Sequence, residues 1–428
     1  MDSLVAYRQS PMEAKRVVVT GLGVVTALGN DVKTTWDNLL HGKSGAGPIT
    51  HFDASQFKTH FACEVKDLDP SNVMEQKEVR KHDRYSHLAM VAADEAMTDA
   101  AIHVENENAL RCGVIMGSGM GGVHALDANI GEFASGDGTP RFSPFFIPMA
   151  IPNISAGLLA IRYGFRGINF ATVSACASSS HAIATAYNYI RFGMADVMLT
   201  GGSEAAIEFA GIGGFNAVRA LSTRNDDPEH ASRPFSASRD GFVLGEGAGC
   251  LVLEEYSHAI ARGAHIYAEV VGAGMTSDAY HIVASDPGGR GAAEAMALAV
   301  QEAGLKPADV EYINTHGTST PIGDVAEAKA IQQVFGDHAY DMNLTSSKSM
   351  TGHLLGGTGA VEAVISILSI VNQMVTPTIN HADGDDDPAI DSRLNFTFNE
   401  AQPRKIHYAL SNNFGFGGHN ACLLFAQI

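Results

Sequence analysis

Cysteine is scarce in this sequence, and its spacing is irregular. The chain has 428 residues, and its five cysteines are Cys63, Cys112, Cys176, Cys250 and Cys422. An odd number of scattered cysteines argues against a disulfide framework. No C-x-x-C pair and no H-E-x-x-H histidine spacing occurs, which argues against a structural metal site. The sequence therefore predicts a protein of a reducing, cytoplasmic setting that binds no metal.

Basic residues are also few. The chain contains 28 Lys and Arg against 47 Asp and Glu, which gives a formal net charge of −19. A strongly acidic surface repels phosphate backbones, so we expect no nucleic-acid partner. Acidic protein partners are disfavoured for the same reason, unless basic residues gather locally on one surface.

Long apolar runs are missing as well. No stretch reaches the ~18–20 apolar residues that cross a bilayer, and the first ten residues lack the basic start and apolar core of a secretory signal. We therefore expect no membrane association. Residues 1–15 are interpreted as an N-terminal extension or leader, with Met12 as a second possible start. Whether residues 1–11 are native is left open.

The residues that are abundant indicate a layered α/β protein. Apolar residues make up 45% of the chain, aromatic residues only 7%, and there are 45 glycines. Residues 16–20 predict a strand that ends in a turn at Gly21–Gly23, and the pattern restarts near Ile266. A glycine-rich segment precedes Cys250 in the first half and Cys422 in the second. We therefore predict two duplicated α/β halves, residues 16–260 and 261–428, with two sheets sandwiched between helices.

One segment resembles a nucleotide-binding motif and another resembles a nucleophile turn, and only the second has all the features of its class. Gly21–Gly29 lacks the third glycine of a dinucleotide fingerprint. By contrast, Thr172–His181 places Cys176 between a strand-like segment, residues 167–173, and an Ala-rich helical segment, residues 182–190. Such a strand–turn–helix arrangement is typical of a nucleophile elbow. The N–H groups at a helix N-terminus favour thiolate over thiol.

Polar groups in the second half follow predicted strands, where α/β proteins place their active sites. His316 follows the strand at residues 311–315, and Lys348 and His353 follow the strand at residues 343–347. A glycine-rich loop spans residues 412–418. Each of these features alone is compatible with a structural role. Together with Cys176 they indicate a nucleophilic thiol served by imidazoles.

Four motifs resemble, in order and spacing, those of the β-ketoacyl-[acyl-carrier-protein] synthases. They are Thr172–Ser179, His316–Asp324, Lys348–Gly356 and Asn413–Gly418, and the resemblance extends from Arg16 to Ile428. The similarity is closest to the type II synthases, which elongate acyl chains in bacterial fatty-acid synthesis. It implies the thiolase-like fold, an α-β-α-β-α sandwich, a homodimer, and acyl carrier protein as partner.

The resemblance also implies a role for each motif residue. Cys176 would carry the acyl group as a thioester, and the backbone N–H groups of Cys176 and Phe414 would form an oxyanion hole. His316 and His353 would bind the malonyl carbonyl and promote decarboxylation. Lys348 would support the electrostatics of the site. Glu362 would pair with Lys348, and Phe414 would also act as a gate at the sulfur.

Further residues match substrate and partner positions of the family. Thr318 and Thr320 match contacts of the phosphopantetheine arm, which belongs to the carrier, so no cofactor of the enzyme itself is expected. Met120 and Phe215 match the acyl channel. The carrier-docking positions match Lys77, Arg80, Lys81, Arg141 and Arg219. The first three have the i, i+3, i+4 spacing of one helix face. His419 departs from the family, which usually has Thr there.

Other condensing enzymes and a hydrolase are the alternatives. A thiolase would carry a second cysteine within residues 412–420, which contain none. A starter-type condensing enzyme would have Asn in place of His353, and a non-catalytic chain-length partner would lack Cys176. A cysteine hydrolase needs water in the site and releases a free acid. The preferred chain length, the role among paralogues and the effect of His419 are left open.

Overall fold

The computed structural model describes residues 14–428, so residues 1–13, including Met12, lie outside the described residues. Ten strands form one hydrogen-bonded sheet in the order β10-β9-β13-β14-β8-β1-β7-β6-β4-β5. In the first half its strands are β1 (Val17–Val25), β4 (Cys112–Gly117), β5 (Asn169–Thr172), β6 (Val197–Glu204) and β7 (Gly247–Glu255). In the second half they are β8 (Ala268–Ser277), β9 (Tyr312–Asn314), β10 (Asn343–Thr345), β13 (Tyr408–Gly415) and β14 (His419–Ala426).

Helices and two small two-stranded sheets complete the fold. The helices are α1 (Val32–Leu40), α2 (Gln76–Val79), α3 (Arg84–Ala100), α4 (Val123–Ser135), α5 (Phe146–Ala150), α6 (Ile154–Tyr163), α7 (Ser178–Arg191), α8 (Phe209–Ala217), α9 (Tyr256–Ala261), α10 (Arg290–Glu302), α11 (Pro321–Phe335), α12 (Lys348–Thr351) and α13 (Thr358–Asn372). The small antiparallel sheets pair β2 (Gly47–Pro48) with β3 (Phe61–Ala62), and β11 (Met374–Val375) with β12 (Gln402–Pro403). The predicted boundary at residue 260 falls within α9.

The two halves repeat the same strand order. Within the first half the order is β1-β7-β6-β4-β5, and within the second it is β8-β14-β13-β9-β10. Each half has two antiparallel pairings followed by two parallel ones. The predicted duplication is therefore confirmed. The two predicted sheets are joined at one edge, because three residue pairs between β1 and β8, starting with Val17 and Val270, make the two half-sheets continuous.

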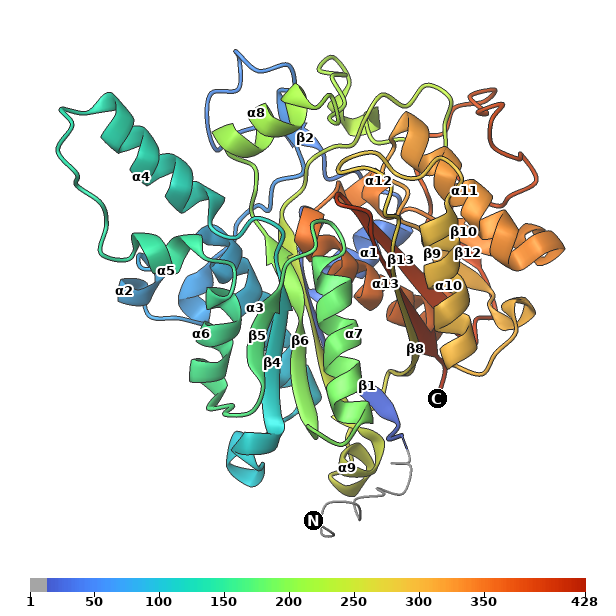
Figure 1. The fold of residues 1–428 in the computed structure, drawn as a ribbon, viewed down its shortest axis with the longest axis horizontal. Coiled ribbons are helices and arrows are strands. Elements are labelled where there is room, and N and C mark those ends of the chain that lie inside the picture. Colours follow the sequence, from blue (N-terminus) through green and yellow to red (C-terminus); the bar gives the residue numbers. More distant parts are fainter. Residues whose placement is uncertain (1–13) are drawn as a thin grey trace, which may run out of the picture.

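Five layers result from this duplication (Figure 1). Helices α7 and α13 form the central layer, where α7 packs on β4 and β6 and α13 packs on β7 and β13. On the outer faces, α3 and α6 cover the first half-sheet and α10 covers the second, with α11 packed against α10. The equivalent helices α7 and α13 both follow the outermost strand of their half-sheet. Their N-terminal ends therefore carry the two polar motifs of the sequence.

Helix α13 lies so deep that its sequence resembles a membrane span. Residues Leu355–Asn372 meet the length and composition of such a span, with a mean hydropathy of 1.5, which the sequence analysis did not expect. Of this segment, 89% is buried inside the protein. A helix that packs on two half-sheets must be apolar on nearly all sides, which explains its composition.

Strand β1 continues through the predicted turn at Gly21–Gly23. A Cβ on Gly21 would lie 2.2 Å from the Ala96 carbonyl oxygen, and one on Gly23 would lie 1.9 Å from the Ala92 carbonyl oxygen. The two glycines thus allow the backbone of α3 to lie directly on the strand. They serve close packing and not a change of chain direction.

We predict that Gly23→Ala lowers the free energy of unfolding by about 3 kcal/mol or more, because its Cβ overlaps the backbone of α3. The measurement is the urea midpoint followed by circular dichroism. Gly157→Ala in α6 is the matched control: its Cβ meets no atom within 4 Å, and Ala favours a helix by about 0.5–1 kcal/mol. Similar midpoints for both variants would contradict the packing argument.

Candidate active site

Cys176 lies at a strained turn between β5 and α7, so the predicted strand–turn–helix arrangement is confirmed. Ala175 has a φ of 50°, a left-handed conformation that costs a non-glycine residue about 1 kcal/mol or more. Gly415 packs directly against this turn: a Cβ there would lie 3.0 Å from the Cys176 backbone nitrogen. The turn is thus held between α7 and the end of β13.

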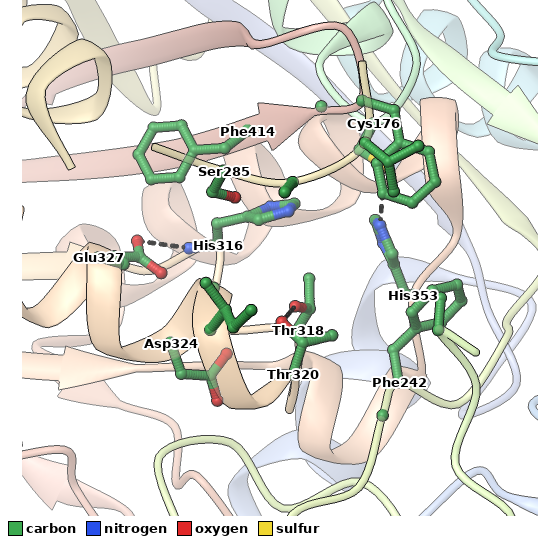
Figure 2. A pocket seen from close by; sticks show the side chains of 18 of the residues that line it. Cys176, Phe242, Ser285, His316, Thr318, Thr320, Asp324, Glu327, His353 and Phe414 are labelled. Atoms are coloured by element: carbon green, nitrogen blue, oxygen red, sulfur yellow. Dashed lines mark hydrogen bonds between the residues drawn. The ribbon is translucent and has the colours of Figure 1, made fainter. Parts of the chain in front are cut away.

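The thiol and the two predicted histidines come together in one cluster (Figure 2). The Nε2 atom of His353 lies 3.0 Å from the Cys176 Sγ atom. On the other side of the same ring, Nδ1 lies 3.0 Å from the hydroxyl oxygen of Thr358. The rings of His316 and His353 are 5.4 Å apart and nearly perpendicular. Three groups capable of acid–base or nucleophilic chemistry therefore share one site.

Burial controls the ionisation of the cysteine. It raises the pKa of the Cys176 thiol to about 12, although the Lys348 charge and the backbone N–H groups of Phe416 and Cys176 act in the opposite direction. A thiolate at this depth loses the water that would solvate it. The N–H groups act in the expected direction, but burial outweighs them and keeps Cys176 a thiol in the protein by itself.

Both histidines are neutral near neutral pH. Burial and the nearby Lys348 charge lower the pKa of His353 well below 6.5. The same two causes, with a smaller effect of His353, lower the pKa of His316. A neutral imidazole can donate one hydrogen bond without bringing a full charge into the cavity. The pair can thus bind a developing negative charge as hydrogen-bond donors.

Lys348 forms a buried ion pair behind the histidines. Its Nζ atom lies 2.5 Å from Glu362 Oε1, and each side chain is 1% exposed. Asn413 donates to the second Glu362 oxygen at 2.7 Å, and Ser347 donates to the first at 3.2 Å. These hydrogen bonds offset part of the free-energy cost of removing the two charged groups from water. The predicted pairing of Lys348 with Glu362 is present.

Phe414 does not lie where the sequence analysis expected it. Its backbone is part of β13, paired with Asn420 of β14, and its ring lies 5.6 Å from the ring of His316, away from Cys176 (Figure 2). The second N–H group directed at the sulfur belongs to Phe416. Phe416 follows the end of β13, where the chain has left the ladder and can turn its N–H toward the elbow.

Two buried carboxylates that the sequence analysis missed hold the loops of the site. Glu204, at the end of β6, accepts hydrogen bonds from the backbone N–H groups of Gly119, Met120 and Gly356 and from the Ser118 hydroxyl. Glu327 of α11 accepts from the N–H groups of His316 and Gly317 at 2.8 and 2.7 Å. Burial raises the pKa of Glu327 to about 7 and also raises that of Glu204.

The two carboxylates serve equivalent loops. Gly119 follows β4 and His316 follows β9, and these two strands occupy the same place in the two halves. In the sequence, Glu204 is a single Glu at the end of a buried strand, and Glu327 is a single Glu on an Ala-rich helix face. That signal does not reveal which N–H groups a carboxylate will meet.

A cavity of about 300 Å³ opens onto the cysteine. Thr318 and Thr320 line it with their hydroxyl oxygens 3.0 Å apart. Phe215 and Arg219 also line it, whereas Met120 does not and is 37% exposed. Of the two predicted acyl-channel residues, only Phe215 therefore contacts this cavity in the single chain.

The predicted basic helix face is interrupted. Lys77 lies in α2, but this helix ends at Val79, so Arg80 and Lys81 lie beyond it. A new helix, α3, starts at Arg84, because the Asp83 carboxylate accepts from the Tyr85 N–H and caps it. The i, i+3, i+4 spacing thus spans a break and does not define one helix face.

Most of the predicted docking cations already have acidic neighbours. Three ion pairs involve them: Lys77 with Glu75, Lys81 with Glu78, and Arg141 with Asp137. Within residues 14–428, Arg80 and Arg219 form no ion pair. Of the five predicted docking cations, Arg219 is therefore the one that both lines the cavity and forms no ion pair within the described residues.

His419 lies next to His181, a neighbour of the Cys176 turn, and does not contact Cys176 directly. Its ring lies 6.4 Å from that of His181, whose Nδ1 contacts the Ser174 hydroxyl at 2.6 Å. Burial, with a contribution from His419, lowers the pKa of His181 to about 4. His419 thus affects His181, which contacts the turn of Cys176, and not Cys176 itself.

Over the described part of the chain, no cluster of three metal-ligating side chains occurs.

Family models account for most of the chain. The N-terminal domain of β-ketoacyl synthase matches residues 14–259, and the C-terminal domain of β-ketoacyl synthase matches residues 267–382. This chain belongs to the β-ketoacyl synthase family. It is an acyl-transferring condensing enzyme with the thiolase-like fold that the resemblance implied.

Named relatives and solved structures agree with this assignment. The chain is 49% identical to the 3-oxoacyl-[acyl-carrier-protein] synthase 2 of Synechocystis over 97% of this chain and 99% of that protein. A β-ketoacyl synthase from Burkholderia phymatum superposes with a TM-score of 0.89 at 37% identity, covering 97% of this chain and all of that one. A ketosynthase solved with its type II polyketide acyl-carrier protein superposes at 0.87 with 32% identity, covering 97% and 100%.

We predict that Glu204→Gln speeds alkylation of Cys176 by iodoacetamide by roughly three- to tenfold at a given pH. The ionised Glu204 raises the pKa of the thiol, so removal of its charge increases the thiolate fraction. The measurement is the rate of mass addition on Cys176 across a pH series.

Glu64→Gln provides the matched control. Glu64 is another buried carboxylate that accepts from two backbone N–H groups and a hydroxyl, those of Thr50 and His51. It does not contribute to the pKa of Cys176, so its loss should leave the rate unchanged. An unchanged or slower rate in folded Glu204→Gln would contradict the electrostatic assignment.

Proposed function

We propose that this enzyme elongates fatty acids by two carbons, through decarboxylative condensation of a Cys176-bound acyl group with malonyl-[acyl-carrier-protein]. The observation that carries the proposal is the contact of the Cys176 thiol with neutral His353, beside neutral His316, in one cavity. The name of the 49%-identical relative, 3-oxoacyl-[acyl-carrier-protein] synthase 2, supports the same reaction.

In the first half-reaction, Cys176 Sγ attacks the thioester carbonyl of acyl-[acyl-carrier-protein]. The new C–S bond forms as the carrier's C–S bond breaks, and the thiol proton ends on the carrier's released thiol. The oxyanion that forms in between would be bound by the N–H groups of Cys176 and Phe416, which both face the sulfur. Fixed N–H donors in a water-poor cavity are effective in such a role.

In the second half-reaction, malonyl-[acyl-carrier-protein] loses CO₂. The C–C bond electrons move into an enolate whose oxygen accepts hydrogen bonds from His316 and His353. The enolate carbon then attacks the acyl carbonyl on Cys176, the C–Sγ bond breaks, and the released thiolate takes from solvent the one proton that the overall reaction consumes. Neutral donors suit this step, because they stabilise the enolate oxygen without holding the malonyl carboxylate as a cation would.

The remaining residues would bind and orient the substrate. Lys348, held by Glu362, would keep both imidazoles neutral, since its charge lowers their pKa values. Thr318 and Thr320 offer adjacent hydroxyl groups to the phosphopantetheine arm. That arm belongs to the carrier protein, and we propose that the enzyme uses no cofactor of its own.

We also propose a homodimer. Strand β5 is an edge of the ten-stranded sheet, and unpaired edge strands invite pairing with another chain. Large apolar side chains are exposed beside it, with Val173 60% and Ile161 82% exposed. Helix α4 and the loop that follows it project from the body (Figure 1), and they expose Phe133 and Phe142, respectively. A second copy would cover this face.

Acyl carrier protein is the proposed partner at the cavity entrance, and the cytoplasm the proposed setting. Arg219 lines the cavity and has no ion pair within the described residues, which suits an acidic carrier. A related ketosynthase was solved with its acyl-carrier protein. We keep Arg80 as a second contact. Lys77, Lys81 and Arg141 would first have to leave their acidic neighbours.

The deciding experiment incubates the purified protein with malonyl-[acyl-carrier-protein] and acyl carriers of graded length, with products read by mass. We expect a 3-oxoacyl-[acyl-carrier-protein] two carbons longer than the acyl donor. A free acid as the product would instead identify a hydrolase, which the proposal excludes.

We predict that Cys176→Ala forms no acyl-enzyme and no condensation product but still releases CO₂ from malonyl-[acyl-carrier-protein]. The pKa values of His316 and His353 are depressed, so both rings stay neutral well below pH 6.5 and protonate only in acid. The CO₂ release should therefore be flat from about pH 6 to about pH 8. An inflection near pH 6.5 would show that a histidine titrates in this range.

We predict that Met120→Phe shortens the longest acyl chain that loads onto Cys176. Gly119, beside Met120, approaches the elbow: a Cβ on Gly119 would lie 3.5 Å from the Ala175 carbonyl oxygen. A flexible Met can move aside for a long chain, and a rigid ring cannot. The measurement is the mass of the acyl-enzyme with donors of graded length. Loading identical to that of the wild type would place the acyl channel elsewhere.

A further inference from the structure

Thr358 is the one hydrogen-bond partner of His353 on the side of the ring that faces away from the cysteine. It is the first residue of α13 and is 1% exposed. Its hydroxyl oxygen lies 3.0 Å from His353 Nδ1, and within residues 14–428 this hydroxyl has no other hydrogen bond. The Thr358 hydroxyl and the His353 ring therefore determine each other's hydrogen positions.

Hydrogen-bond accounting separates the two neutral forms of this imidazole. If Nδ1 carried the proton, it would donate to the hydroxyl oxygen, and the buried hydroxyl hydrogen would have no acceptor. If Nε2 carries the proton, the hydroxyl donates to Nδ1, and Nε2–H donates toward the sulfur 3.0 Å away. A buried donor without an acceptor is costly, so the second form is favoured.

We infer that Thr358 is a positioning residue that holds His353 as the Nε2–H tautomer, so that the ring presents a donor to Cys176 and to the bound substrate. The consequence for the reaction rests on the proposed function: the same N–H that faces the sulfur would face the malonyl carbonyl oxygen. His353 then acts as a hydrogen-bond donor and not as the base that removes the thiol proton.

His316 has no comparable partner, which makes Thr358 specific to one of the two histidines. The Nδ1 atom of His316 is buried and has no hydrogen-bond partner within the described residues. Glu327 holds this residue through its backbone N–H instead. Of the two histidines of the site, only His353 thus has a side-chain partner within the described residues that can fix its tautomer.

The direct test uses nuclear magnetic resonance and does not depend on activity. In protein labelled with ¹⁵N histidine, the shifts of the two ring nitrogens identify the tautomer, and His353→Gln assigns the signal. We expect the Nε2–H pattern in the wild type and in Thr358→Ser, and a mixture of tautomers in Thr358→Val. An Nδ1–H pattern in the wild type would overturn the inference, even if Thr358→Val failed to fold.

The kinetic test measures CO₂ release from malonyl-[acyl-carrier-protein] in the Cys176→Ala background. Thr358→Val, which keeps the shape and removes the hydroxyl, should lower kcat roughly tenfold with little change in KM, and Thr358→Ser should restore it. Unchanged kcat in folded Thr358→Val would refute the positioning role. If the wild type releases no CO₂ at all, the proposed function fails, while the nuclear magnetic resonance result still decides the tautomer.

Thr200→Val controls for the loss of a buried hydroxyl. Thr200 of β6 is fully buried, and its hydroxyl donates to the Ile115 carbonyl at 2.9 Å. Its loss should lower the melting temperature without changing the tautomer of His353 or the kcat of CO₂ release. An equal fall in kcat for both variants would attribute the effect to general destabilisation and overturn the role of Thr358.

Discussion

Loss of water around Cys176 is the physical constraint on which the rest of the site depends. The same burial raises the pKa of the thiol and lowers those of both histidines. Lys348 enters this environment only because Glu362 lies 2.5 Å from its ammonium group. Hydrogen bonds become stronger in such surroundings, and an unpaired polar group becomes more costly. Chemistry at this site is therefore a matter of which donors are already directed at the position where charge develops.

The duplicated fold supplies those donors in pairs. Helices α7 and α13 occupy the same layer, and their N-terminal ends bring the elbow of Cys176 next to the turn that carries His353. The loops after β4 and β9 are likewise equivalent, and each is held by a buried carboxylate that accepts two successive backbone N–H groups. The carboxylates come from a strand in one half and a helix in the other. The two halves thus hold equivalent loops with buried carboxylates from different kinds of element.

Close packing ties this site to the stability of the whole chain. Apolar side chains of α7 and α13 form one core cluster with residues of both half-sheets. Small residues let the layers approach closely, as where a Cβ on Gly359 would lie 2.1 Å from the Ser180 hydroxyl oxygen. Since cores of this density respond to single added atoms, substitutions in the central layer will change site geometry and stability together.

The sequence by itself determined the α/β class, the duplication, the strand–turn–helix around Cys176 and the residues that gather there, because these follow from local periodicity and from motifs with fixed spacing. Only the tertiary structure decided that β1 and β8 join the halves, that Gly21 and Gly23 lie inside a strand, and that the predicted basic helix ends at Val79. It also decided that Phe416, and not Phe414, directs its N–H at the sulfur, and that Thr358 contacts His353. The ionisation state of Cys176 was also decided only by the tertiary structure. A helix N-terminus is visible in the sequence, whereas the depth at which the fold buries it is set by elements far away along the chain.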